Sequence, residues 1–345
     1  MSSTETEVTD STVTGTSISV DKIHPSFNEP SADVTLASHE GTLFRLHSSY
    51  LCLASGWFRT LLSIPQSLAT DSDTPPNPSE TMIPMSESEH ILVTLLSIIS
   101  WKSIPPLNEL GFVENLLRAG EKYEMPSVIS IARLAIMAGQ ILDTHPIRVY
   151  GIASSRGWTA EAKLASTKTI GLDLLSPECM QDLETVDSLY MAKLLLLHRR
   201  RRELFRASAL ESTKSFVINA QAIYNASASS APNSKFSCKD HTRAQVMRQA
   251  EERKWAWWGK VEQSRDVPSK ALLHRPEMYG VLEMTCSICQ AKLLDRDATL
   301  DKLSKVVDGL PVTVEVCCVA CDSPCGLGDE LIQPLAQTFQ AGGPS

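Results

Sequence analysis

The spacing of apolar residues changes abruptly near the start of the chain, and this change constrains the fold more than any other feature. Val34 and Leu36 alternate with polar residues, and after a turn at Gly41 the alternation resumes at Leu43. Alternation with period two predicts strands, and a glycine turn between them predicts a hairpin. From His47 onward the spacing is helical, at Leu51, Ser55, Phe58 and Leu62. The segment therefore predicts α+β structure.

The next residues continue this order of elements. Residues 67–80 are rich in Pro, Ser and Asp and predict a surface loop, and Met82 to Met85 predict a short strand. Ser86 and Glu89 form a capping-box pattern, which predicts the start of a helix over an apolar run. Two further helices are expected around 112–123 and 127–138.

The spacing DV(x)9F-R-L-H(x)3L(x)3S(x)2F resembles the opening of a BTB/POZ domain. The matching positions are Asp33, Val34, Phe44, His47, Leu51, Ser55 and Phe58. The later run LLRAGEKYEMPSV, with its Lys122-Tyr123 step, resembles the closing helix pair of that family. The resemblance covers residues 29–140 and is nearest to the BTB proteins of mushroom-forming fungi. It implies a short sheet with helices, a non-enzymatic role in homotypic or heterotypic protein association and, in many members, recruitment to a cullin-type ubiquitin ligase.

The matching residues also have simple structural explanations. Val34, Phe44, Leu51 and Phe58 are expected to lie in a core, because they are the apolar members of strands and helices. Asp33 and His47 are polar residues at the ends of elements, where such side chains satisfy backbone groups. No nucleophile, base and orienting acid recur together, so we expect no enzyme.

Composition divides the rest of the chain. We expect a disordered arm at 1–28, the BTB/POZ-like domain at 29–140, a helical extension at 141–207, a linker at 208–235, a mostly helical Cys/His-containing domain at 236–335 and a tail at 336–345. The runs PIRVYGIASSRGW and LLLLHRRRRELF resemble the extension that follows the domain in the fungal proteins. In the C-terminal domain, Trp255, Trp257 and Trp258 are expected to pack its core.

Charge and hydropathy limit the partners and the location. The run HRRRRELFR, His198 to Arg206, reads as a nuclear-import or phosphate-binding stripe, or as the solvated end of a helix. The net charge of −8 argues against nucleic acid as a partner. The longest apolar stretch, 91–101, is about half of the ~20 residues that a membrane span requires. We expect a protein of the cytoplasm or nucleus that does not bind membranes.

The nine cysteines raise the question of a metal. Cys286 and Cys289 form a C-x-x-C pair, which supplies two of the four ligands of a tetrahedral zinc site. Three partners are open: Cys238 with His241, Cys318 with Cys321, or no partner, with the Cys317 to Cys325 cluster holding a metal alone. Buried hydrophobic cysteines without metal, or a redox pair, are the remaining explanations.

The resemblance to the fungal proteins selects among these sets. Those proteins carry C-x-x-C/H before a Trp-Trp helix and C-x-x-C before a helix like LLDRDATLDKLSKVV. It implies a structural zinc ion on Cys238, His241, Cys286 and Cys289, with Cys318 and Cys321 as the alternative pair. Two hypotheses on function follow: an adaptor that binds a cullin scaffold or a second copy of itself, or a transcriptional or chromatin regulator that uses the Cys/His module.

Overall fold

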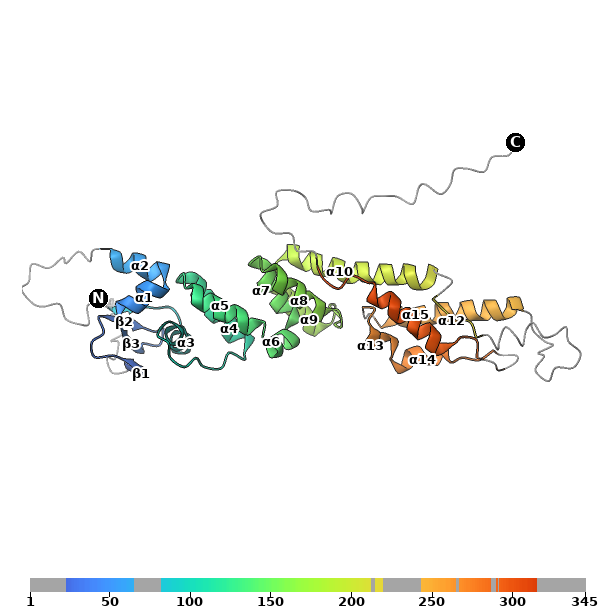
Figure 1. Cartoon of the computed structure of the whole chain (residues 1–345), viewed down its shortest axis with the longest axis horizontal. Coiled ribbons are helices and arrows are strands. Elements are labelled where there is room, and N and C mark those ends of the chain that lie inside the picture. The colour runs from blue at the N-terminus through green and yellow to red at the C-terminus, as the bar shows by residue number, and fades with distance from the viewer. Residues whose placement is uncertain are drawn as a thin grey trace, which may run out of the picture. The chain divides into compact units, whose positions relative to one another are not determined.

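The computed structural model describes residues 23–64, 82–211, 215–219, 243–264, 267–286, 290 and 292–314. The chain divides into two compact units, the N-terminal unit to Ala138 and the C-terminal unit from Gly139. Helices predominate among the described residues, and a single small sheet lies in the N-terminal unit (Figure 1). The α+β class expected from the sequence is therefore confirmed.

The sheet contains four strands among the described residues. These are β1 (Ile23–Asn28), β2 (Val34–Ala37), β3 (Leu43–Leu46) and β4 (Met82–Pro84), in the order β1-β3-β2-β4. The predicted hairpin is β2–β3, whose strands are antiparallel and pair Leu36 with Phe44. Gly41 has a φ of 84°, a value that glycine adopts without strain. β1 is parallel to β3, and β4 is parallel to β2.

Strand β1 corrects the expected disordered arm. Residues 23–28 lie within that predicted arm, yet they form a strand at the edge of the sheet. The sequence IHPSFN alternates poorly and contains Pro25, which strands tolerate at a sheet edge. Phe27, only 2% exposed, joins the core and explains why the segment is held. The rest of the predicted arm lies outside the described residues.

Five helices complete the described part of the N-terminal unit. They are α1 (Ser48–Ala54), α2 (Gly56–Ser63), α3 (Glu89–Ile99), α4 (Leu110–Lys122) and α5 (Pro126–Ile136). Val34, Phe44, Leu51 and Phe58 are buried, as expected for core residues, and pack with the apolar face of α3. This core is made within the N-terminal unit alone.

The described part of the C-terminal unit is almost entirely helical (Figure 1). Its elements are α6 (Gly139–Thr144), α7 (Pro146–Ser155), α8 (Thr159–Thr169), α9 (Pro177–Glu184), α10 (Ser188–Arg206), the π-helical turn η1 (Ala207–Glu211), α12 (Arg243–Gln263), α13 (Lys270–Leu273), α14 (Pro276–Leu282) and α15 (Arg296–Asp308). Proline opens α7, α9 and α14, where its missing N–H costs no hydrogen bond. None of the described helices combines the length and apolar character needed to cross a bilayer.

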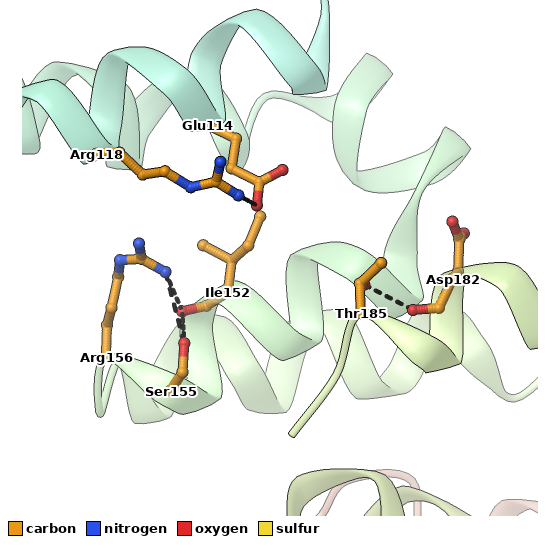
Figure 2. Close-up of polar contacts among 7 residues, drawn as sticks. All are labelled: Glu114, Arg118, Ile152, Ser155, Arg156, Asp182 and Thr185. Carbon is orange, nitrogen blue, oxygen red and sulfur yellow. Dashed lines mark hydrogen bonds and ion pairs between the residues drawn. The ribbon is translucent and has the colours of Figure 1, made fainter. Parts of the chain in front are cut away.

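Side chains at the helix ends of this unit donate additional hydrogen bonds to carbonyls of the last turn (Figure 2). At the end of α7, Arg156 Nη1 donates to the Ile152 carbonyl at 3.3 Å and lies 3.5 Å from Ser155 Oγ. At the end of α9, Thr185 Oγ1 donates to the Asp182 carbonyl at 2.7 Å. Gly157 lies just past the end of α7 with a φ of 69°, the left-handed conformation in which glycine commonly ends helices.

The core of the C-terminal unit differs from the predicted domain plan. Trp257 and Trp258 are buried in it as expected, whereas Trp255 is 51% exposed. The same core contains Phe205 and Phe216, which the sequence assigns to the helical extension and the linker. Aromatic side chains of this size stabilise a core strongly, so the segment around η1 is part of the C-terminal fold. Residues 220–235 of the predicted linker lie outside the described residues.

Candidate functional site

Asp33 caps helix α1 from a position 15 residues earlier in the chain. Its carboxylate accepts hydrogen bonds from the Ser48 backbone N–H at 2.7 Å and from Ser48 Oγ at 2.6 Å. Burial alone would raise the pKa of Asp33, but these hydrogen bonds and the nearby His47 together lower it. The side chain therefore works as an ionised cap for the first turn of α1.

His47 connects the loop after β1 to the start of α1. Its Nε2 lies 3.2 Å from Ser31 Oγ and 3.4 Å from Glu29 Oε1, and its Nδ1 lies 3.8 Å from Asp33 Oδ1. The side chain is 31% exposed. It holds the N-cap position of α1 but makes no side-chain hydrogen bond to the helix. Asp33 thus supplies the cap expected from the sequence, and His47 contacts acidic and hydroxyl side chains instead.

Ser55 joins the corner between α1 and α2 to the end of α4. The side chain is fully buried. Its Oγ accepts from the Phe58 N–H at 3.0 Å and donates to the Tyr123 carbonyl at 2.5 Å. The neighbouring Gly56 N–H donates to the Glu124 carbonyl at 3.2 Å. This serine of the signature pattern therefore fixes the packing of two helical pairs rather than facing a ligand.

The Lys122-Tyr123 step forms a charged contact at the same end of α4. Lys122 Nζ lies 2.9 Å from Glu87 Oε1, and the Tyr123 hydroxyl donates to Glu87 Oε2. Burial and the bond to Glu87 raise the pKa of Tyr123. Burial alone would raise the pKa of Glu87, but the bonds from Tyr123 and Lys122 lower it. Sequence reasoning missed Glu87, because its partners lie about 35 residues away and no local pattern marks them.

The arginine run of α10 is divided between the surface and the interior of the C-terminal unit. Arg199 is exposed and pairs with Glu203 at 2.7 Å. Arg201 is 3% exposed: its Nε donates to the Pro268 carbonyl at 2.9 Å, and its Nη1 donates to the Pro311 carbonyl at 2.9 Å. The sequence suggested two interpretations of this run, a basic stripe or a solvated helix end. Neither interpretation predicts a buried arginine.

Cys286 is the only predicted zinc ligand among the described residues. It is fully buried in the C-terminal core. The Gln290 N–H donates to the Cys286 carbonyl at 3.0 Å, and Thr285 and Lys292 form an isolated antiparallel bridge.

The remaining predicted ligands, Cys238, His241, Cys289, Cys318 and Cys321, lie outside the described residues. Within the described part, no group of three or more His, Cys, Asp or Glu side chains is placed to bind a metal. The zinc site therefore stays a prediction.

Comparisons with known proteins add no family assignment. No family model matches the chain, and a search of curated proteins finds no significant relative.

Proposed function

We propose that this chain is a non-enzymatic protein–protein interaction adaptor whose N-terminal unit is a BTB/POZ-like domain. The observation that carries the proposal is the order of elements in that unit. A hairpin, a helical pair, a strand parallel to the first hairpin strand and three helices follow one another as the sequence resemblance implies. Parallel pairing of β2 with β4 requires the crossover that α1 and α2 occupy.

The polar residues of the signature support a binding role rather than a catalytic one. Asp33 and Ser55 have their oxygens engaged in hydrogen bonds that hold helix ends. By contrast, Tyr50 and Leu53 on α1 are 37% and 82% exposed, and residues three apart share one face of a helix. An apolar face on a short helix beside an edge of the sheet suits association with a second copy or with another protein.

Sedimentation velocity of the intact chain tests the homotypic form of this proposal. Leu53→Asp places a charge on the exposed face of α1 without disturbing the core, and we expect it to shift a dimer to monomer. Leu134→Asp is the matched control, because Leu134 is 73% exposed on α5 of the same unit. The α1 interface is contradicted if the wild-type chain is a dimer and Leu53→Asp remains one. It is also contradicted if Leu53→Asp and Leu134→Asp dissociate to the same extent.

The heterotypic form names a cullin scaffold as the first partner to test. We expect the intact chain and a purified cullin scaffold to co-elute in size-exclusion chromatography. Binding to DNA without binding to a cullin would instead favour the chromatin hypothesis. The affinity for DNA should then fall as the salt concentration rises, because Lys and Arg side chains that neutralise phosphates release bound counterions.

A further inference from the structure

A pocket of about 400 Å³ lies in the N-terminal unit between the edge strand β1, strand β3, helix α1 and the end of α3. Its polar lining includes Glu29, Arg45, Tyr50, Ser100 and Lys102. These residues are up to 73 positions apart in the chain (102 minus 29), so the pocket is a product of the fold and no sequence pattern marks it.

The Arg45 guanidinium and the Tyr50 hydroxyl are among the donors of this pocket that have no hydrogen-bond partner within the described residues. Tyr50 is 37% exposed. The Ser100 oxygen also has no partner, but it has no surface accessible to solvent, so a ligand in the pocket does not reach it in this conformation. The two donors of Arg45 and Tyr50 on one pocket wall point to a ligand that supplies acceptors.

The other two charged residues of the pocket are already engaged. Lys102 Nζ donates to the Ser26 carbonyl and lies 4.1 Å from the centre of the Phe27 ring. Glu29 Oε1 lies 3.4 Å from His47 Nε2. The guanidinium of Arg45 and the ammonium of Lys102 have no ion pair in the described part of the pocket. The Tyr50 hydroxyl accompanies them, so the pocket presents positively charged donors that suit an anionic acceptor.

Trp101 stands in the chain between the lining residues Ser100 and Lys102 and does not itself line the pocket. It is 91% exposed. Its φ of 57° occurs because the end of α3 forms a Schellman turn, in which the Lys102 N–H donates to the Ser97 carbonyl at 2.9 Å. Glycine usually occupies this left-handed position, so tryptophan there is conformationally unfavourable. The fold thus keeps a large aromatic side chain exposed at the position between two lining residues of the pocket.

We propose that this pocket binds a carboxylate of an acidic segment of a partner protein. A carboxylate fits the paired N–H groups of Arg45 bidentately, and a remaining lone pair accepts from the Tyr50 hydroxyl. The Trp101 ring covers an apolar residue next to the acidic one. The inference rests on the proposed function, since it specifies what the interaction unit recognises.

The test measures binding of the intact chain to a library of labelled 12-residue peptides with glutamate, glutamine or phosphoserine at the central position. We expect the best glutamate peptides to bind about tenfold or more tightly than their glutamine partners, the range for a hydrogen-bonded charge. Arg45→Gln should remove this difference. Arg118→Gln should preserve it, because Arg118 is an exposed arginine of the same unit that pairs with Glu114 on α4 at 2.9 Å (Figure 2).

Tyr50→Phe separates recognition from folding. The variant should bind the glutamate peptides several-fold more weakly while its resistance to urea is unchanged, because the lost hydroxyl has no partner in the described fold. Equal binding of glutamate and glutamine peptides, or full binding by Arg45→Gln, overturns the proposal. If only the phosphoserine peptides bind, the group that the pocket recognises is a phosphate, and the assignment of a carboxylate is wrong.

The two proposals fail separately. If the chain forms the α1 dimer or binds a cullin but shows no preference for acidic peptides, the adaptor function stands and the pocket assignment is wrong. If acidic peptides bind through Arg45 but no dimer or cullin complex forms, the pocket stands and the adaptor proposal fails.

Discussion

The buried His198 predicts how the stability of the C-terminal unit depends on pH. The side chain is 8% exposed, and its Nε2 lies 3.1 Å from Thr169 Oγ1. Burial, together with the positive charges of Arg201 and Arg202, lowers the pKa of His198 from 6.5 to about 4. The histidine therefore stays neutral in the folded protein well below the pH at which it becomes charged in the unfolded chain.

The sign and size of the effect follow from this difference. Between pH 6.5 and pH 4 the unfolded chain binds more protons than the folded one, so the free energy of unfolding falls as the pH falls. Each pH unit within this window corresponds to about 1.4 kcal/mol. From pH 7 to pH 5, His198 alone should remove about 2 kcal/mol of stability.

Urea unfolding at the two pH values checks this prediction. Hydrogen exchange of peptides from α10 and α12 would report on the C-terminal unit separately from the N-terminal one. His198→Gln keeps an amide that can contact Thr169 but cannot titrate, so the loss between pH 7 and pH 5 should be smaller by about 2 kcal/mol in this variant. Equal losses in the variant and the wild type refute the reasoning.

Three further predictions concern the other buried groups and the metal. Ser55→Ala should destabilise the N-terminal unit by about 2–4 kcal/mol, because it removes a helix cap and leaves a buried carbonyl without its donor; an unchanged urea midpoint would exclude that role. Arg201→Leu should lower the free energy of unfolding of the C-terminal unit by about 2–4 kcal/mol, because its carbonyl partners lose their donor. Arg199→Leu on the surface should lower it by less than about 1 kcal/mol. Similar values for the two variants in urea unfolding would contradict the division of the arginine run of α10 into buried and exposed members. The purified chain should carry about one zinc ion by mass spectrometry, and Cys238→Ser should release it; retention in that variant with loss in Cys321→Ser would move the site to the alternative pair.

The elements that sequence reasoning located correctly are those with local signals. The hairpin around Gly41 is marked by alternation and a turn residue, and strand β4 is marked by the short apolar run that begins at Met82. These signals act within a few residues, so one sequence suffices to read them. Phe44 and Phe58 were predictable as core residues for the same reason.

The interactions that sequence reasoning missed join distant residues. The expected capping box at Ser86 does not form: α3 begins at Glu89, and the Glu40 carboxylate accepts from the Glu89 N–H at 2.8 Å across 49 residues. Arg201 contacts carbonyls 67 and 110 positions away, so the sequence alone shows only a basic run. The donors around Arg45 are brought together in the same way.

The most direct test of the adaptor proposal is lysine cross-linking of the intact chain in its native cells, followed by mass spectrometry. The account predicts that the cross-links to partners come from the N-terminal unit, for example through Lys102 or Lys122, and that they reach a cullin scaffold or a second copy of this chain. It also predicts that Leu53→Asp removes the links to the second copy. Partner cross-links confined to lysines of the C-terminal unit, such as Lys260 or Lys270, and reaching chromatin proteins would contradict it.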